Sequence, residues 1–321
     1  MKNKTIGILM GGYSDEFHIS MQSGEVVYTT LKNHFYCYKI QILKNNWYLI
    51  DGKNKYEVRQ KSFSVSERPH IKFDCIFNVI HGAPGEDGQM KKYFEKLKIP
   101  ITGCDSYAAE LTYDKIKCLD FLSSNGIQTA KSFKILKNDN FDIDVVISKV
   151  GLPCFVKASR SGSSFGIYKA KNKNDVLKSI ESSFKLDTKV LIESNIEGRE
   201  FSVGVISYHG GIKVLPITEI ISKNDFFDYN AKYEGEAEEI TPAKISNNLK
   251  SKLNLISENI YKLLSLKGFS RSEFIVNENG VFFLETNTIP GLTNESILPQ
   301  QALKANISLL ELFKNAIHEV I

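Results

Sequence analysis

The stretch VNENGVFFLETNTIPG, residues 276–291, is the most informative part of the sequence for the fold. Its apolar strand runs directly into the polar side chains of Glu285 and Asn287. The run Arg271–Val276 also reads as a strand, so the two segments predict an antiparallel hairpin. Residues 278–280, Glu-Asn-Gly, suit a three-residue hairpin loop with glycine in the left-handed conformation. That register places Glu273 directly opposite Glu285 on one face of the sheet, where like charges repel.

The end of this hairpin predicts a metal site. Side chains alternate along a strand, so Asn287 joins the face of Glu273 and Glu285 while Thr286 points away. Carboxylates that repel each other need a cation, and these three side chains offer only hard oxygen ligands. Mg²⁺ binds a few carboxylates together with substrate phosphates and keeps water at its other positions. We therefore expect a magnesium site at the hairpin end.

A second stretch, FVKASRSGSSFGI at residues 155–167, offers groups for phosphate. Lys157 ends a strand, and residues 162–166 form a loop of small residues whose N–H groups and hydroxyls suit phosphate oxygens. It is not a P-loop, because no Gly-x-x-x-x-Gly-Lys-Ser/Thr sequence occurs. Taken alone, the loop is equally typical of an ordinary turn. Lys115 in LTYDK, taken alone, is equally typical of a solvated surface lysine. Together with the hairpin, these features predict an ATP–Mg²⁺ site between two α/β layers.

Composition excludes several other classes of protein. The chain has 321 residues, 42% hydrophobic and 24% charged, which is typical of a soluble protein of two or three domains. No apolar run approaches a membrane span, and the N-terminus MKNKTIGILMGG reads as a first strand rather than a signal peptide. The five cysteines lack Cys-x-x-Cys spacing, so neither disulfides nor zinc are expected and a reducing cytoplasm fits. A net charge of +4 without a basic block interleaved with aromatics argues against nucleic-acid binding.

Strands and helices alternate along the chain, which predicts an α/β protein. The expected strands are 5–10, 38–43, 47–51, 74–80, 100–103, 131–136, 154–158, 167–170, 189–193, 200–207 and 214–220. The expected helices are 19–31, 89–97, 119–125, 174–184 and 246–266. A polar but aromatic-rich loop follows at 222–238.

The chain resembles the D-alanine–D-alanine ligases of the ATP-grasp superfamily along nearly its whole length. The resemblance rests on eight motifs in order: GILMGGYSDEFHIS (7–20), NVIHGAPGEDGQ (78–89), TYDK (112–115), GLPCFVKASRSGSSFGI (151–167), VLIESNIEGRE (190–200), FFDYNAKY (226–233), GFSRSEF (268–274) and LETNTIPGLTNESILP (284–299). It implies an α/β ATP-grasp fold with a Rossmann-like domain at 1–105. The nucleotide is then held between two α+β domains, at 106–195 and at 196–321. The second of these domains carries the metal site and the loop 222–238, which is expected to act as a lid because a reactive intermediate must be shielded from water.

The resemblance also implies a role for each matching residue. For ATP it implies that Lys115 and Lys157 bind the phosphates, that Glu193 lies at the adenine edge with Ile196 in the hinge segment, and that Glu200 binds the ribose. For the metal it implies two Mg²⁺ or Mn²⁺ ions, bound by Glu273, Glu285 and Asn287. The family usually has Asp at position 273, so the geometry at this ligand is an open question. For the first D-alanine it implies Glu16 and His81, with a hydrogen-bonded bridge from Glu16 through Ser163 to Tyr233. For the second D-alanine it implies Lys232, Ser296 and Ile297. Arg271 and the Gly291 N–H are implied to stabilise the tetrahedral intermediate.

The expected activity is ATP-dependent joining of two D-alanines through a D-alanyl phosphate, with release of ADP and phosphate, for peptidoglycan precursor synthesis. A cytoplasmic homodimer that binds neither nucleic acid nor membrane is implied. Two alternatives stay open. One is a ligase that joins D-alanine to D-lactate, against which Tyr233 argues, and the other is a non-catalytic nucleotide-binding protein, against which Glu16, Tyr233 and Arg271 argue.

Overall fold

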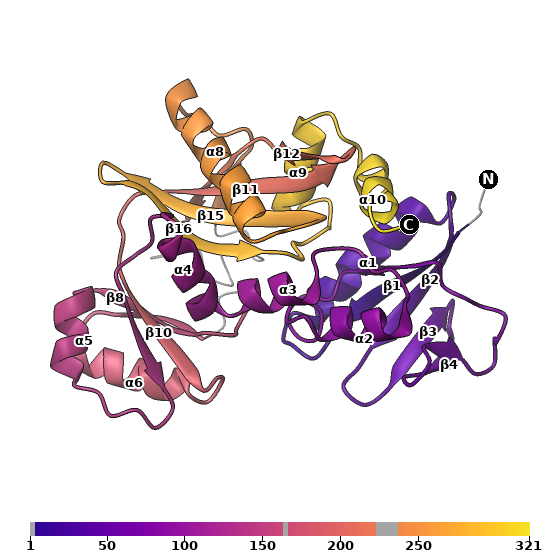
Figure 1. Ribbon diagram of the computed structural model, residues 1–321, viewed down its shortest axis with the longest axis horizontal. Helices are drawn as coiled ribbons and strands as arrows, with labels where there is room; N and C mark the ends of the chain where they lie inside the picture. Colours follow the sequence, from indigo (N-terminus) through magenta and orange to yellow (C-terminus); the bar gives the residue numbers. More distant parts are fainter. Residues whose placement is uncertain (1–3, 163–165, 223–236) are drawn as a thin grey trace.

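The computed structural model describes residues 4–162, 166–222 and 237–321, which form three sheets with helices between and around them (Figure 1). The first sheet has the order β5-β4-β3-β2-β1-β6, and β1 pairs in parallel with both of its neighbours. A strand in the middle of a parallel sheet is covered on both faces, which is why TIGILMG is buried almost throughout. The elements of this part are β1 (Thr5–Gly11), α1 (Phe17–Leu31), β2 (Tyr36–Ile42), β3 (Trp47–Asp51), β4 (Asn54–Arg59), β5 (Ser64–Val65), β6 (Cys75–Asn78) and α2 (Gln89–Leu97).

The second sheet is antiparallel, with the order β7-β10-β8-β9, and lies at the lower left of Figure 1 with α5 and α6 against one face. Its core is closed by its own segment, because every buried residue of that cluster falls between Ile135 and Ile192. The elements are β7 (Ser132–Leu136), α5 (Ile143–Val150), β8 (Cys154–Ala158), β9 (Ile167–Ala170), α6 (Lys173–Ser183) and β10 (Lys189–Ser194).

The third sheet has the order β14-β13-β11-β15-β16, with β12 also paired to β11. Its strands are β11 (Arg199–Tyr208), β12 (Gly211–Val214), β13 (Thr218–Ser222), β14 (Ala237–Ile240), β15 (Phe269–Asn277) and β16 (Gly280–Asn287). The remaining helices are α3 (Ser106–Tyr113), α4 (Lys115–Ser124), α8 (Asn247–Leu263), α9 (Ile297–Lys304) and α10 (Leu309–His318). Buried side chains of α3, α4 and α8 share one core with this sheet.

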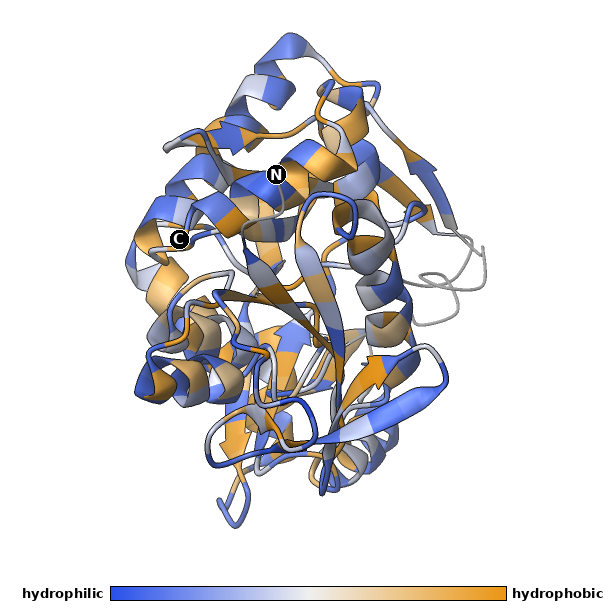
Figure 2. Ribbon diagram, turned by 90° about the vertical axis from the view of Figure 1, so that its right-hand side faces the viewer, coloured by the Kyte–Doolittle hydropathy of each residue, from blue (hydrophilic) through white to orange (hydrophobic). Residues whose placement is uncertain are grey.

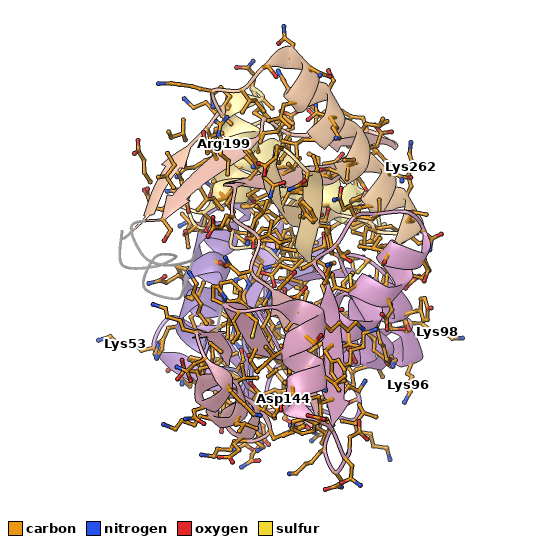
Figure 3. The ribbon with its side chains drawn as sticks, turned by 90° about the vertical axis from the view of Figure 1, so that its left-hand side faces the viewer. Lys53, Lys96, Lys98, Asp144, Arg199 and Lys262 are labelled. Carbon is orange, nitrogen blue, oxygen red and sulfur yellow. The ribbon has the colours of Figure 1, made fainter. Side chains whose placement is uncertain are left out.

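The first and third parts share a further core. Phe77 of β6 packs edge-on against Phe313 of α10, with ring centroids 5.6 Å apart, and Ile6 of β1 belongs to the same buried cluster. Helices in Figure 2 carry both hydrophobic and hydrophilic segments, as amphipathic helices on a sheet do. Charged side chains lie at the outline of the molecule in Figure 3 and point outward, as the labelled Lys53, Lys96, Lys98 and Lys262 do.

The hairpin register is confirmed at its functional end and wrong at its turn. Glu273 pairs with Glu285, as expected, but Asn277 pairs with Gly280, so the turn has two central residues instead of three. A bulge compensates, because Phe274 pairs with Phe283 and Leu284 is left as the extra residue. Without the bulge, the shorter turn would shift β16 by one residue and place Glu285 on the face opposite to Glu273. The bulge restores the pairing of Glu273 with Glu285.

Two other boundaries also differ from the sequence-based expectation. The single strand expected over 214–220 is two strands, β12 and β13, because Pro216 has no N–H to continue the ladder. The expected lid 222–238 is shorter at both ends, since Ser222 pairs with Ala237 and Ile221 with Glu238. The lid residues between them lie outside the described residues, as do the aromatic side chains that suggested the lid.

Candidate functional site

The site lies between the polar faces of the second and third sheets. On β11, Phe201 and Val203 are buried in the core beneath α8, whereas Ser202 between them pairs with Glu273 on the opposite face. On β8, Val156 is buried in the α5–α6 core, so Lys157 faces the other way. Burial lowers the pKa of the Lys157 ammonium, but carboxylates raise it more, Glu193 first and then Glu285 and Glu273 of the third sheet. The two polar faces are therefore close enough to act on one ligand.

Lys157 and Glu193 form the second-sheet side of the site. They sit diagonally on neighbouring strands, since Lys157 pairs with Leu191, and their side chains meet at 2.7 Å between Nζ and Oε2. Glu193 is only 3% exposed, and within the described part of the chain its other oxygen, Oε1, is buried without a hydrogen-bond partner. A buried acceptor left without a donor is costly, so this position suits a ligand that brings an N–H, such as an adenine amino group.

Lys115, the first residue of α4, reaches the site from the third-sheet side. Its Nζ donates to the carbonyl of Ser161 at 2.6 Å and lies 3.6 Å from Oε2 of Glu285. Ser161 and Gly162 begin the small-residue loop, so Lys115 joins the base of that loop to the hairpin end. Lys115 and Lys157 are thus positioned to meet an anionic ligand from two elements.

The predicted metal ligands converge as the hairpin geometry requires. Glu273 is buried and accepts a hydrogen bond from Nη1 of Arg271, which also donates to Oγ of Ser202 at 3.1 Å. Asn287 pairs with Arg271 across the ladder and uses Oδ1 to accept the N–H of Ile289 at 3.0 Å. Arg271 and Lys115 partly neutralise the two carboxylates. Among the described residues, no three His, Cys, Asp or Glu side chains cluster tightly enough to hold a metal by themselves.

The donor set nevertheless suits a hard divalent cation. Two carboxylates and an amide oxygen are too few to enclose an ion, which matches Mg²⁺ or Mn²⁺ shared with substrate phosphates rather than a protein cage. The residues that could hold such ions are Glu273, Glu285 and Asn287.

A small cavity of about 90 Å³ brings together the residues predicted for the first amino acid. It is lined by Glu16, His81 and Arg271, together with Gly291 and the metal-side residues Glu285 and Asn287. Glu16 is 7% exposed and stands at the start of α1, where it enters the site from the first sheet.

The neighbours of His81 fix the orientation of its ring and the tautomer that the neutral ring adopts. Its Nδ1 faces the carbonyl of Ile289 at 2.8 Å, and a carbonyl only accepts, so Nδ1 carries the proton. Nε2 then accepts from the hydroxyl of Ser23 at 3.3 Å, while that hydroxyl oxygen accepts the N–H of Leu292 at 3.1 Å. Burial lowers the pKa of His81, which agrees with a neutral ring. His81 therefore ties the end of the first sheet to the loop after β16 as well as lining the cavity.

A second cavity of about 490 Å³ adjoins the first at Arg271 and Gly291. Ser296 and Ile297, predicted for the second amino acid, line it at the start of α9. Ser296 exchanges a hydrogen bond with the hydroxyl of Thr293 at 2.8 Å, and Glu239 of β14 lines the same cavity. Arg271 and Gly291 thus stand where the two cavities meet.

The other predicted residues divide into two groups. Ile196 and Glu200 lie in and just after residues 195–198, which join β10 of the second sheet to β11 of the third sheet, and the hinge and ribose roles expected for them stay predictions. Ser163, Lys232 and Tyr233 lie outside the described residues, and their roles stay predictions.

Three residues of the site were missed in the sequence. Glu86 is buried beside Glu16, and its Oε2 accepts the N–H of Gly82 at 2.8 Å. It stands inside the quoted GEDG segment, which was the available signal. Ser202 orients Arg271, but one serine in a strand gives no signal, and Asp114 is discussed below.

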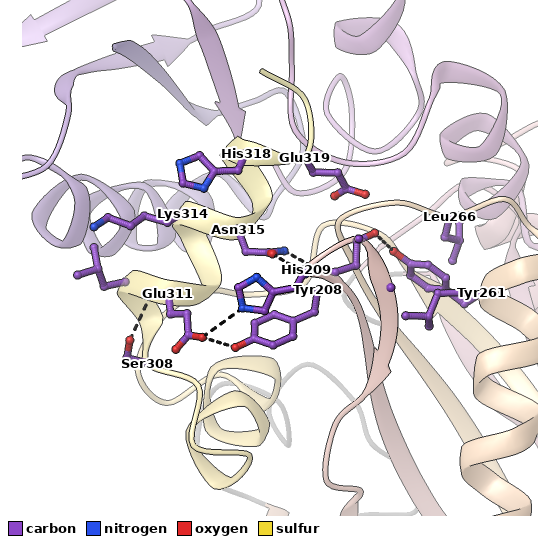
Figure 4. Close-up of a pocket in the computed structure, with 15 residues that line it drawn as sticks. Tyr208, His209, Tyr261, Leu266, Ser308, Glu311, Lys314, Asn315, His318 and Glu319 are labelled. Atoms are coloured by element: carbon purple, nitrogen blue, oxygen red, sulfur yellow. Dashed lines mark hydrogen bonds and ion pairs between the residues drawn. The ribbon is translucent and has the colours of Figure 1, made fainter. Parts of the chain in front are cut away.

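A further cavity of about 780 Å³ lies elsewhere, between the β11–β12 hairpin and α10 (Figure 4). Its polar groups already satisfy one another: Glu311 bonds the hydroxyl of Tyr208, and Asn315 accepts the N–H of His209 at 3.0 Å. Glu319 likewise accepts the N–H of Gly268 at 3.0 Å. It brings together none of the predicted site residues.

Two protein-family models together match most of the chain. The family model for the D-ala D-ala ligase N-terminus matches residues 5–104, and that for the D-ala D-ala ligase C-terminus matches residues 121–318. The chain belongs to the D-alanine–D-alanine ligase family. A D-alanine–D-alanine ligase of Flavobacterium johnsoniae is 50% identical over 317 residues, 98% of each chain.

Solved structures of the family share the fold. The D-Ala:D-Ser ligase VanG from Enterococcus faecalis has 31% identity and a TM-score of 0.86, with full coverage of both chains. The D-alanine–D-alanine ligase from Bacillus anthracis complexed with ATP has 25% identity and a TM-score of 0.79, over 99% of this chain and 96% of that one. The expected α/β ATP-grasp fold is thereby confirmed.

Proposed function

We propose that the protein joins two D-alanines to D-alanyl-D-alanine at the expense of ATP, releasing ADP and phosphate, for peptidoglycan precursor synthesis. The observation that carries the proposal is the convergence of three elements on one site. Lys157 and Glu193 face Glu273 and Glu285 across the two sheets, and Glu16 enters from α1. An enzyme that must bring ATP and two amino acids together needs groups of these three kinds.

ATP is proposed to lie between the two polar faces. Glu193 Oε1 receives the adenine amino group, Ile196 packs in the hinge, and Glu200 binds the ribose. Lys115 and Lys157 then hold the phosphates, which requires Lys157 to exchange part of its 2.7 Å contact with Glu193 for phosphate oxygens. Positive groups fixed around the transferring phosphoryl stabilise the charge that spreads over its oxygens.

Glu273, Glu285 and Asn287 are proposed to hold two Mg²⁺ or Mn²⁺ ions together with the phosphates. Such ions neutralise phosphate charge when bound. The carboxylates of this chain supply the negative field that retains them, and Arg271 keeps Glu273 pointed into the site.

The amino acids are proposed to occupy the two cavities. Glu16 binds the ammonium of the first D-alanine beside His81, and the carboxylate of that D-alanine is phosphorylated. The second D-alanine is held by Lys232, Ser296 and Ile297, and its amine attacks the acyl phosphate. The guanidinium of Arg271 and the Gly291 N–H stand where the cavities meet, so they receive the oxyanion of the tetrahedral intermediate. Phosphate then leaves as the amide bond forms.

The lid proposed over residues 223–236 and the Glu16–Ser163–Tyr233 bridge would exclude water, because an acyl phosphate hydrolyses readily. Domains at 1–105, 106–195 and 196–321 remain our proposed division, although α3 and α4 pack in the core of the third sheet. Among the described residues, no helix is long and apolar enough to cross a membrane. The homodimer and the cytoplasmic location stay predictions.

The identity of the second substrate is the part most open to test. The similarity to a D-Ala:D-Ser ligase shows that this fold accommodates other second substrates. We propose D-alanine, and the alternatives are D-lactate or D-serine.

The test measures phosphate release from ATP with D-alanine, L-alanine, D-alanine plus D-lactate, and D-alanine plus D-serine, with products separated chromatographically. We expect turnover with D-alanine alone and D-alanyl-D-alanine as the main product of every mixture that contains it. A mixed product that dominates would change the second substrate, and ATP binding without turnover on any amino acid would contradict the enzymatic proposal.

A further inference from the structure

A buried network surrounds Asp114, the residue before Lys115. Asp114 is 2% exposed, and its Oδ1 accepts the N–H of Lys117 at 3.2 Å, which caps α4. The same oxygen accepts the hydroxyl of Ser159 at 2.7 Å, and Oδ2 accepts Nζ of Lys189 at 2.7 Å. Three hydrogen bonds thus tie one carboxylate to three elements: α4, the end of β8 and the start of β10.

Ser159 completes the connection through its other groups. Its hydroxyl oxygen accepts the N–H of Ile116 at 3.2 Å, and its carbonyl accepts the N–H of Lys115 at 3.0 Å. Ser159 is fully buried and lies two residues after Lys157 on the same chain segment. The backbones that carry Lys115 and Lys157 are therefore bound to each other at this point.

The network joins two parts whose cores are mostly separate, although Leu191 of β10 is buried in the core of the third sheet. Ile116 and Leu119 of α4 are buried with Phe283 in the core of the third sheet, whereas Val156 and Val190 are buried in the core of the second sheet. Lys189, which is charged, reaches across to Asp114 from the second sheet. The buried contact thus crosses the boundary that also contains the ATP site.

We propose that the Asp114–Ser159–Lys189 network is a positioning joint that sets the spacing of Lys115 and Lys157, and thereby the affinity of the enzyme for the phosphates of ATP. The proposal rests on the proposed function for the identity of the ligand. It assigns no contact between Asp114 and a substrate.

The physical basis is the asymmetry of a buried ion pair. Such a pair adds little net stability, because desolvation offsets much of its attraction, but removing one partner leaves the other charge buried. Burial raises the pKa of Asp114, but the hydrogen bonds from Lys189 and Ser159 outweigh it, so the net pKa is lowered and the carboxylate stays charged. The pair therefore fixes geometry more than it stabilises the fold.

Asp114→Asn is the main test variant. Asparagine is as good an N-cap as aspartate, so α4 keeps its start, while the charge that holds Lys189 is lost. We expect the Kd for Mg²⁺–AMP-PNP, measured by calorimetry without amino acid, and the KM for ATP to rise about tenfold or more, because small displacements of positioned groups are costly. The KM for D-alanine should change less than about twofold.

Matched variants separate positioning from general damage. Asp120→Asn breaks an exposed ion pair with Lys134 that links the same helix to β7 of the same sheet, and it should leave the Kd and both KM values unchanged. Lys189→Met should reproduce Asp114→Asn, and the double variant should be no worse than either single variant. Thermal unfolding of each variant shows whether it is folded.

The proposal is overturned if folded Asp114→Asn binds AMP-PNP within twofold of wild type, or if the KM values for ATP and D-alanine rise together. Additive increases of the Kd in the double variant would also overturn it, because Asp114 and Lys189 are proposed to act through one shared contact. If the wild-type protein binds AMP-PNP but does not turn over D-alanine, the proposed function fails, while the Kd comparison still decides the role of the joint.

Discussion

At the scale of the residue, Glu273 has two contacts of opposite character: it lies across the ladder from Glu285 and accepts a hydrogen bond from Arg271. Shortening it should weaken both contacts, whereas removing it should leave Arg271 without its acidic partner. We therefore predict that Glu273→Asp keeps measurable ATP turnover and that Glu273→Ala lowers kcat by about 100-fold or more. Steady-state phosphate release at millimolar Mg²⁺ measures both.

Glu285→Gln is the comparison variant for that prediction. It keeps the shape of the side chain but removes the charge opposite Glu273, so turnover should be lost while the Tm stays near that of wild type. Near-normal turnover by folded Glu285→Gln, or by Glu273→Ala, would mean that these carboxylates do not hold the metal.

Glu86 should make the stability of the fold depend on pH. Burial, and then the charge of Glu16, raise the pKa of Glu86 to about 8 from the ordinary value of 4.5. The folded state therefore keeps a proton that the unfolded state has released above pH 4.5. The stability that Glu86 contributes is complete below about pH 4.5 and is lost as pH rises through about 8.

The corresponding prediction uses Glu86→Gln, whose amide cannot ionise. Between pH 5 and pH 9 the Tm of wild type should fall relative to that of the variant by at least about 3 °C, which corresponds to about 1 kcal/mol. Differential scanning calorimetry in matched ionic strength measures it. Parallel Tm curves for the two proteins would show that Glu86 does not titrate in this range.

At the scale of the element, α8 covers the apolar face of the third sheet, whose other face carries the site. Leu253 of this helix is fully buried in the core that the helix shares with the sheet, and Leu255, two residues on, is 70% exposed. Leu253→Ala should reduce the free energy of unfolding by about 2–5 kcal/mol. Leu255→Ala should change it by less than about 0.5 kcal/mol. Both should leave the KM for ATP unchanged, since neither side chain is on the site face.

Denaturant unfolding followed by circular dichroism compares the two variants. Equal losses of stability in Leu253→Ala and Leu255→Ala would contradict the packing of α8. A changed KM for ATP in folded Leu253→Ala would show that the two faces of the sheet are coupled.

The hairpin shows how far sequence reasoning reaches at this scale. Strand alternation is local, so it was sufficient to place Glu285 and Asn287 on the same face. The pairing of Glu273 with Glu285 was predicted from a three-residue turn, and it holds in the structure because the bulge offsets the shorter turn. The bulge at Leu284 and the shorter turn depend on how β16 packs, and no local pattern shows them. Pro216 is different, because its missing N–H was visible in the sequence and should have divided the expected strand 214–220.

The site was predictable to the same degree. Residues in specific motifs, such as Lys115, Lys157 and Glu16, are placed around the expected site. Ser202 and Asp114 act through contacts between segments that are distant in sequence, such as the 69-residue separation from Ser202 to Arg271. Such contacts follow from the tertiary fold and leave no trace in a single sequence.

At the scale of the whole molecule, two of the four cores among the described residues lie in different parts of the chain and form separate units. One core joins the first sheet to α9 and α10, and another lies within residues 135–192. Phe313→Ala should cost about 3–5 kcal/mol and Ile180→Ala about 2–5 kcal/mol, each in its own unit. Hydrogen exchange read by mass spectrometry should therefore rise in α1, β1 and α10 for Phe313→Ala, and in β8 and β10 for Ile180→Ala.

Each variant serves as the control for the other. Increased exchange across the whole chain in both variants would mean that the protein unfolds as one cooperative unit, contrary to the two cores.

The packing of Phe313 against Phe77 also determines when the chain can finish folding during its synthesis. The strands of the first sheet are translated early, but α10, which completes one of the two cores on that sheet, is translated after the other two sheets. The core between the second sheet and its helices α5 and α6 contains only residues of that segment, so it can close while later parts of the chain are still being translated. The face of the first sheet that shares its core with α10 should therefore remain partly uncovered, within reach of chaperones, until α10 has been translated.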